Sequence, residues 1–132
     1  MAPVHNIRPF PTDGPSDGEP LDDRSLAAHY AYPDGLAAPY VRVNFVASID
    51  GAVSVDGRSA PLGSEADRCV FGLLRELADV VLVGAGTVRV EDYRGARRPT
   101  RGRDTPPPIA VVTASAARAP AARLFTDTPV AP

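Results

Sequence analysis

The sequence has one cysteine and no apolar run long enough to cross a bilayer. A single thiol, Cys69, excludes a disulfide framework within one chain and a zinc site built from several cysteines, and we expect no metal site. A membrane-spanning helix needs about 20 apolar residues, and the N-terminus lacks the apolar stretch of a signal peptide. We therefore expect a soluble, cytoplasmic protein with no membrane partner.

The sequence also lacks an excess of positive charge. Lysine is absent, and the fourteen arginines face sixteen acidic residues, which gives a net charge of −2 and a pI near 5.6. A general nucleic-acid binder normally has a basic surface, so we expect no nucleic-acid partner. Five arginines gather between Arg94 and Arg103, but they have no interleaved aromatic residues. This cluster predicts a solvated loop rather than an RNA site.

Proline is scarce only in the middle of the chain. Of fifteen prolines, one, Pro61, lies between Val41 and Tyr93, where hydrophobic periodicity is dense. The flanks are rich in Pro, Ala and Arg, a composition typical of loops or linkers. Residues 1–21 are expected to be disordered or to form an extended arm, which leaves residues 22–132 as the folded part.

Short elements are predicted in the first half of the chain. Asp22 or Asp23 can cap a helix that runs to about Ala31. Apolar residues alternate along residues 41–47, which predicts a strand with one apolar face. The dipeptides Asp50-Gly51 and Asp56-Gly57 then favour turns.

The middle of the chain predicts a βαβ unit. Ser64 can cap a helix from about Glu65 to Leu77, which carries apolar residues at helical spacing. The continuous apolar run at residues 80–83 is typical of a strand buried on both faces. With the strand at residues 41–47, these elements would form a unit that is normally parallel and right-handed.

The second half predicts fewer elements. A short helix should run from Gly84 to about Asp92, and residues 109–113 form a third strand candidate. The remaining tail is expected to have no regular element. Three strands cannot close a doubly covered sheet, so the chain is expected to be cut off within an α/β domain.

The stretch VVLVGAGTV carries the strongest chemical signal. Gly84, Gly86 and Thr87 follow a buried strand at the start of a helix, where backbone amides favour phosphate or another anion. A structural turn is an alternative explanation, because the string is neither a dinucleotide fingerprint nor a Walker loop. Asp50 follows the first strand and is either a turn residue or a candidate catalytic residue. Arg75 could reach a phosphate or could be solvated.

The order and spacing of VRVNFVASIDGAVS and SEADRCVFGLLRELADVVLVGAGTVRVEDY resemble the RibD C-terminal, or pyrimidine reductase, family of riboflavin biosynthesis. The resemblance covers about Val41 to Thr113. It implies a three-layer α/β/α fold like that of dihydrofolate reductase, incomplete in this chain. It also implies NADPH-dependent reduction of 5-amino-6-(5-phosphoribosylamino)uracil to 5-amino-6-(5-phosphoribitylamino)uracil. The expected partners are this small phosphorylated ribosylaminopyrimidine and, when the protein is full length, a second copy in a homodimer.

The resemblance also implies roles for individual residues. Besides the turn glycines Gly84 and Gly86, the implied cofactor contacts are Val46, Pro61, Thr87 and Glu91. The implied substrate contacts are Ser59 and Arg75, whose guanidinium suits a phosphate. The catalytic residue stays unknown, with Asp50 as the candidate.

Two features of the family are missing from this sequence. The zinc deaminase half, with His-x-Glu and Pro-Cys-x-x-Cys, is absent, and so is a second glycine pair that follows a later strand. We therefore expect the N-terminal portion of a reductase domain, inactive on its own. Two other functions stay open: an NADPH reductase of the same fold for another substrate, and a non-catalytic truncated remnant.

Overall fold

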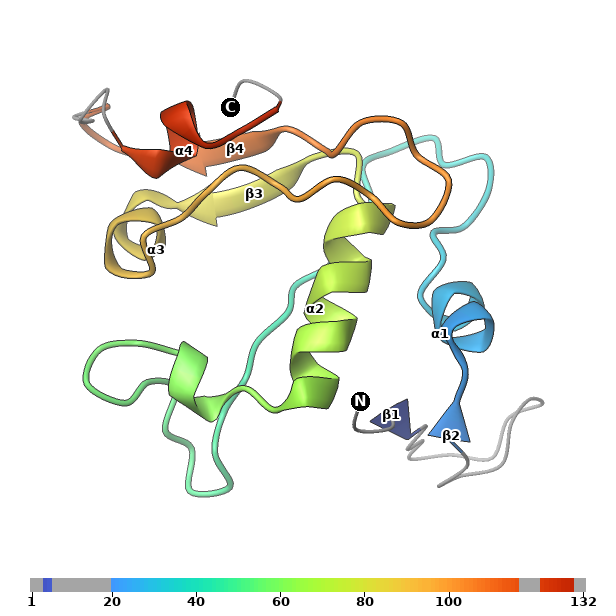
Figure 1. The fold of residues 1–132 in the computed structure, drawn as a ribbon, viewed down its shortest axis with the longest axis horizontal. Coiled ribbons are helices and arrows are strands. Elements are labelled where there is room, and N and C mark those ends of the chain that lie inside the picture. The colour runs from blue at the N-terminus through green and yellow to red at the C-terminus, as the bar shows by residue number, and fades with distance from the viewer. Residues whose placement is uncertain (1–3, 6–19, 117–121, 130–132) are drawn as a thin grey trace.

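The structure is a computed structural model that describes residues 4–5, 20–116 and 122–129 of the 132-residue chain. Its elements, in chain order, are β1 (Val4–His5), β2 (Pro20–Leu21), α1 (Asp23–His29), the 3-10 helix η1 (Ala60–Leu62), α2 (Glu65–Leu77), β3 (Val81–Gly84), α3 (Ala85–Val90), β4 (Ile109–Val112) and α4 (Arg123–Thr126) (Figure 1). β1 and β2 pair antiparallel with each other. The rest of the arm expected at residues 1–21 lies outside the described residues.

The two longest helices begin where their capping residues predict. Asp22 Oδ1 accepts a hydrogen bond of 2.7 Å from Ser25 N, and α1 follows. Ser64 Oγ accepts a hydrogen bond of 3.0 Å from Asp67 N, and α2 follows. Each cap satisfies one of the backbone N–H groups that a helix start leaves without an intrahelical partner. Both predicted helices are confirmed, and α2 has the predicted bounds.

A two-stranded parallel sheet forms from β3 and β4. Val81 lies opposite Ile109 and Gly84 opposite Val112. The predicted helix after Gly84 is confirmed as α3, and the strand candidate at residues 109–113 is confirmed as β4. A parallel pair requires a crossover connection, and here the crossover contains α3. The parallel strands and their helices make the described part an α/β structure.

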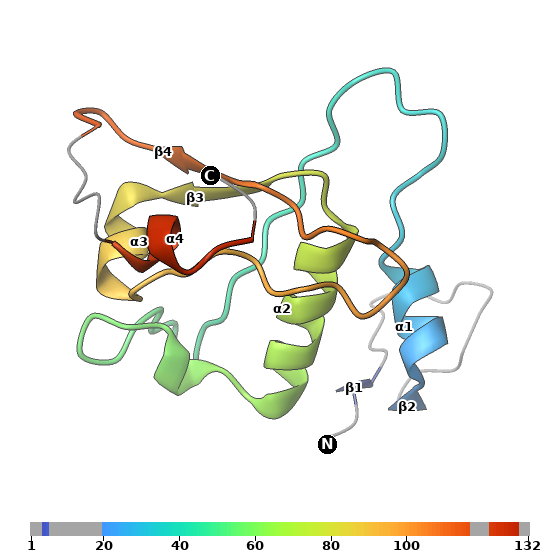
Figure 2. The same ribbon diagram turned by 45° about the horizontal axis from the view of Figure 1, so that its top comes forward.

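The hydrophobic core lies on one face of this sheet. It consists of Val83 from β3, Val88 from α3, Ile109 from β4 and Leu124 from α4. Figure 2 shows α3 and α4 on the same side of the strands in that view. On the opposite face, Leu82 remains 68% exposed. The prediction that residues 80–83 form a strand buried on both faces is therefore wrong, because the helices in the core cover one face only.

The strand predicted at residues 41–47 is also wrong, because this segment is irregular in the structure. Val43 and Phe45, on the alternating apolar face, are 66% and 85% exposed. A strand requires a neighbouring strand to accept and donate its ladder hydrogen bonds. Within the described residues, the two sheets have two strands each and neither includes this segment. The βαβ unit expected from it is therefore not formed.

The C-terminal tail does contain a regular element, contrary to prediction. α4 starts at Arg123 without a side-chain cap, and Leu124 is fully buried in the core. Helices this short are not stable through intrinsic propensity, so tertiary burial is what holds α4. The sequence offered neither a cap nor a period from which to predict it.

Two arginines of the loop after α3 bind acidic and carbonyl groups, and of these Arg101 is partly buried whereas Arg103 stays exposed to solvent. Arg101 pairs with Asp23 of α1 at 2.8 Å and with Glu76 of α2 at 3.2 Å. Arg103 Nη1 donates to the carbonyl oxygen of Ala78 at 2.6 Å, at the C-terminal end of α2. A cation is favourable at that end of a helix. The loop therefore connects α1 to α2, and it crosses the end of α2 in Figure 1.

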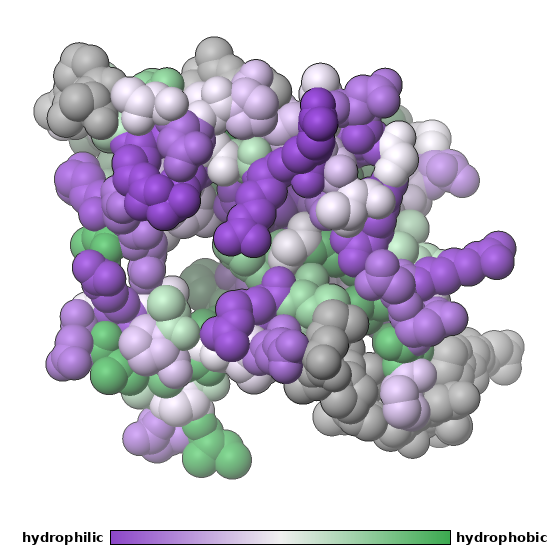
Figure 3. All heavy atoms as spheres, viewed as in Figure 1, coloured by the Kyte–Doolittle hydropathy of each residue, from purple (hydrophilic) through white to green (hydrophobic). Residues whose placement is uncertain are grey.

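The surface is divided in character. In the view of Figure 3, hydrophilic residues dominate the upper part, whereas hydrophobic residues reach the surface near the loop that precedes α2. That loop contains the predicted Asp56-Gly57 turn, with φ angles of 49° and 77°. Both values are positive, as a type I′ turn requires, and Val55 pairs with Arg58 across it. The turn prediction is confirmed.

Truncating Leu124 tests whether α4 is part of the core. Leu124→Ala should lower the free energy of unfolding by about 2–5 kcal/mol, because it removes a fully buried side chain. Phe125→Ala is the matched control on the same helix, since Phe125 is 40% exposed and its loss should cost less than about 1 kcal/mol. Urea unfolding of both variants measures the difference, and equal losses would contradict the packing described for Leu124.

Candidate functional site

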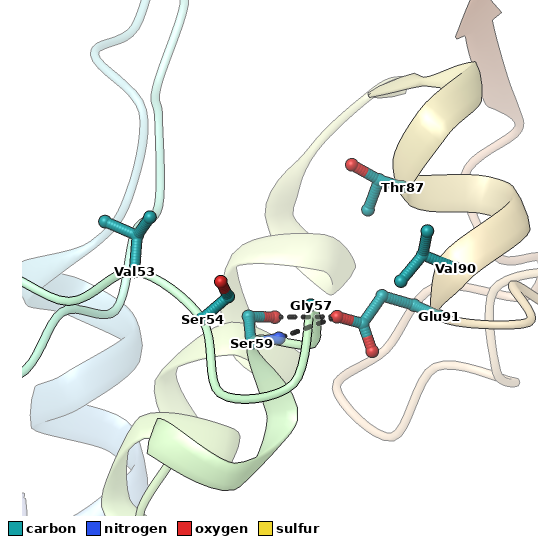
Figure 4. Close-up of a pocket in the computed structure, with 7 residues that line it drawn as sticks. All are labelled: Val53, Ser54, Gly57, Ser59, Thr87, Val90 and Glu91. Carbon is teal, nitrogen blue, oxygen red and sulfur yellow. Dashed lines mark hydrogen bonds between the residues drawn. The ribbon is translucent and has the colours of Figure 1, made fainter.

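An open hollow of about 230 Å³ lies between α3 and the loop that contains the Asp56-Gly57 turn (Figure 4). It is lined by Val53, Ser54, Gly57, Ser59, Thr87, Val90 and Glu91. Four of these residues come from the loop and three from α3 or its C-terminal cap. The hollow is thus made by two segments about thirty residues apart in the sequence.

Glu91 joins the two sides of the hollow. Its Oε1 accepts a hydrogen bond of 2.8 Å from Ser59 N and one of 3.1 Å from Ser59 Oγ. Figure 4 shows the carboxylate reaching from the end of α3 to the loop. Hydrogen bonds to an ionised acceptor are stronger than those between neutral groups. One carboxylate oxygen therefore fixes where the loop lies against α3.

Three of the predicted site residues meet here: Ser59, Thr87 and Glu91. Thr87 and Glu91 are four residues apart on the same side of α3, as helix periodicity requires. Ser59 comes from the opposite wall. The Thr87 side chain is exposed, so its hydroxyl is open to a ligand. α3 contributes one hydroxyl and one carboxylate, and the loop contributes the N–H and hydroxyl of Ser59, both of which donate to Glu91.

Four other predicted cofactor residues do not line the hollow: Val46, Pro61, Gly84 and Gly86. Pro61 lies in η1, next to the loop. Gly84 caps α3 with a φ of −73°, and a Cβ added at Gly84 or Gly86 would meet no atom within 4 Å. Packing within the chain therefore does not require glycine at either position. Both exposed glycines leave free space beside the start of α3.

Arg75 lies away from the hollow, in the last turn of α2. Its guanidinium carbon lies 5.4 Å from the centre of the Phe71 ring and 5.3 Å from that of Tyr93. Arg75 Nη1 also donates a hydrogen bond of 3.2 Å to Tyr93 Oη. Cation–π contacts of this kind hold a guanidinium in place. Arg75 is therefore packed between aromatic rings rather than free in solvent.

Asp50 sits in a turn outside the hollow. Its Oδ1 accepts a short hydrogen bond from Ser48 Oγ, and Gly51 N donates to Ser48 O at 2.9 Å. The bond from Ser48, followed by the bond from the backbone N–H of Ala52, lowers the pKa of the Asp50 carboxyl. A general base at neutral pH needs a pKa raised toward 7, so this shift goes the wrong way for that role. Asp50 lies in a turn in this structure, and a catalytic role for it stays a prediction.

The sequence did not identify the other lining residues: Val53, Ser54, Gly57 and Val90. Val90 is three residues from Thr87, so helix geometry could have placed it beside that residue. The predicted Asp56-Gly57 turn marked the right loop, but nothing in the sequence indicated which helix it would approach. The contact with Glu91 supplies that information.

Metal and membrane features are not found in the described part of the chain. Among those residues no group of three or more His, Cys, Asp or Glu side chains could hold a metal ion. No described helix is long and apolar enough to cross a membrane.

Comparison with known proteins gives one family. A sequence model of the RibD C-terminal domain matches residues 39–131. The chain is 37% identical over 98 residues to the 2,5-diamino-6-ribosylamino-4(3H)-pyrimidinone 5′-phosphate reductase of Archaeoglobus fulgidus, which covers 67% of this chain and 45% of that protein. It is 36% identical over 91 residues to the riboflavin biosynthesis protein RibD of Mycobacterium tuberculosis, covering 67% of this chain and 27% of that protein. The chain thus spans less than half the length of either relative.

Removing the Ser48 hydroxyl should change the titration of Asp50. The hydrogen bond from Ser48 lowers the pKa of the Asp50 carboxyl in the folded protein. The stabilisation from this bond is therefore fully present above the ordinary pKa of aspartate, and it is lost as the pH falls through the lowered pKa. Ser48→Ala should raise this pKa toward its ordinary value, whereas Ser54→Ala should leave it unchanged. Carboxyl NMR titration measures both, and an equal pKa in wild type and Ser48→Ala would contradict the role of the hydroxyl.

Proposed function

The chain belongs to the RibD C-terminal domain family, and on that premise we propose that it forms part of an NADPH-dependent reductase of riboflavin biosynthesis. Its dihydrofolate-reductase-like α/β fold is the fold of that family. The proposed reaction reduces 5-amino-6-(5-phosphoribosylamino)uracil to its ribitylamino product. One observation carries the proposal: Ser59, Thr87 and Glu91, assigned to substrate or cofactor by resemblance, line one hollow.

The groups around the hollow suit a nucleotide. A carboxylate such as that of Glu91 accepts hydrogen bonds from sugar hydroxyls, which is a common way for proteins to hold a ribose. The Thr87 hydroxyl can donate to a phosphate oxygen or accept from a hydroxyl. The free space beside Gly84 and Gly86 supports the close approach of a ligand to the backbone there. When bound, NADPH would supply a hydride to the ribose C1′ of the substrate.

The size of the hollow limits what it would hold. At about 230 Å³ it is smaller than the roughly 300–1,000 Å³ of typical ligand pockets. It would therefore hold one part of a dinucleotide, with the remainder outside it. In the proposed enzyme, the residues of this chain bind and orient the reactants, and orientation alone can supply a large part of the rate.

A second substrate is favoured by a specific likeness. The Archaeoglobus fulgidus relative is named for a diaminopyrimidinone phosphate, which retains an amino group where the uracil has an oxygen. We keep that reduction as the alternative, with the same cofactor. The cytoplasmic location, the homodimer and the role of Arg75 toward the substrate phosphate stay predictions.

The proposal is tested by turnover of the protein as its gene encodes it. Purified protein is mixed with NADPH and either phosphoribosylaminopyrimidine, and the loss of NADPH absorbance is followed. We expect substrate-dependent oxidation, with the larger kcat/KM identifying which pyrimidine is used. If neither compound causes NADPH to be oxidised, the proposed function is overturned and a non-catalytic chain is favoured.

Thr87→Val tests the cofactor side of the hollow. This change keeps the shape of the side chain but removes a hydroxyl, and a hydrogen bond to a charged group contributes about 1.5–3 kcal/mol. The Kd for NADPH should therefore rise about tenfold or more. Thr126→Val, an exposed position on α4, is the matched control and should bind as wild type does. Fluorescence titration gives both constants, and equal affinity of Thr87→Val and wild type would contradict the role of Thr87.

A further inference from the structure

Both hydrogen-bond donors of Ser59 are occupied by the protein itself. Its backbone N–H and its hydroxyl both point to Glu91 Oε1, at 2.8 and 3.1 Å. A serine has no other donor, since the hydroxyl carries a single hydrogen. Ser59 therefore has nothing left to donate to a ligand while this contact exists.

The chemistry of a phosphate makes this arrangement significant. Phosphate oxygens accept hydrogen bonds and carry negative charge, so a phosphate needs donors and avoids nearby carboxylates. Glu91 offers Ser59 the same kind of partner that a phosphate would, namely an anionic oxygen. A phosphate and the Glu91 carboxylate would thus compete for the same two donors.

We propose that Glu91 is a built-in anion that occupies the donors of Ser59, and that a phosphorylated ligand must displace this carboxylate to bind there. The inference rests on the proposed function for the phosphorylated nature of the ligand. The contact itself does not depend on it. Glu91 is thereby both a wall of the hollow and a latch that keeps the Ser59 loop against α3.

The loop can leave α3 without disturbing the core. Residues 51–61 are all exposed, and none of them belongs to the apolar cluster around Val83 and Leu124. Within the loop, the Val55–Arg58 bridge and the Asp56-Gly57 turn are local and would move with it. Opening the latch therefore costs little beyond the two hydrogen bonds to Glu91. Segments held in this way are drawn from the least stable part of a fold.

Amide hydrogen exchange tests the latch without any ligand. Glu91→Ala removes the acceptor, so exchange at Ser59 N–H should accelerate about three- to tenfold, allowing for the partial exposure of the contact. Glu91→Gln retains an oxygen acceptor and should give a smaller acceleration. Unchanged exchange in Glu91→Ala, with helical content retained by circular dichroism, would overturn the latch.

Phosphate binding tests the displacement. Ribose 5-phosphate represents the substrate side, and adenosine 2′,5′-bisphosphate represents the cofactor side. Glu91→Gln should bind one of these probes about three- to tenfold more tightly than wild type. In the wild type, the Ser59 donors are free of Glu91 in only a fraction of the molecules, and the apparent affinity is reduced by that fraction. The probe that gains identifies which phosphate reaches Ser59.

Asp92→Asn is the matched control for this titration. It removes the same charge from the adjacent residue, whose carboxylate pairs with Arg123 at 2.9 Å rather than with Ser59. Asn tolerates the positive φ of 47° at this position. An equal gain in Asp92→Asn would show general charge repulsion and overturn displacement, as would no gain with either probe in Glu91→Gln. Accelerated exchange and tighter phosphate binding without pyrimidine turnover would leave the latch standing and refute the proposed reductase.

Discussion

The parallel ladder between β3 and β4 is the constraint on which the rest of the structure depends. It places Val83 and Ile109 on one face of a short sheet, and that apolar face must be covered. α3 begins directly after β3, so burial of Val88 fixes the rotation of a helix that is only six residues long. Helix geometry then turns Thr87 and Glu91 sideways from the core, toward the loop. The orientation of Thr87 and Glu91 therefore follows from the packing of Val88 in the core.

The opposite wall of the hollow has no comparable support. Its loop makes a tight turn because Asp56 and Gly57 both adopt positive φ, which shapes the loop locally without saying where it lies. In the part of the chain that the structure describes, Ser59 of this loop donates two hydrogen bonds to Glu91 at the end of α3. A rigid wall from the core thus faces a wall held by one carboxylate. This asymmetry is the structural basis of the proposed displacement of Glu91 by a ligand.

What the sequence could predict follows from the range of the forces involved. The starts of α1 and α2 depend on capping within three residues, and the Asp56-Gly57 turn depends on two, so local chemistry was sufficient. α4 depends on Leu124 finding a cluster formed by distant residues, and no local signal marks it. Ser59, Thr87 and Glu91 were identified from the order of motifs in a family. Their meeting around one hollow was visible only in the structure.

The two wrong strand predictions share one physical cause. Hydrophobic alternation at residues 41–47 and the apolar run before Gly84 state which side chains avoid water, but neither pattern states how many neighbours a strand has. In the described residues β3 has one neighbour and residues 41–47 have none, so Leu82 and Phe45 stay exposed at 68% and 85%. The periodicity correctly indicates which side chains are apolar, but it does not indicate whether a neighbouring strand or helix covers them.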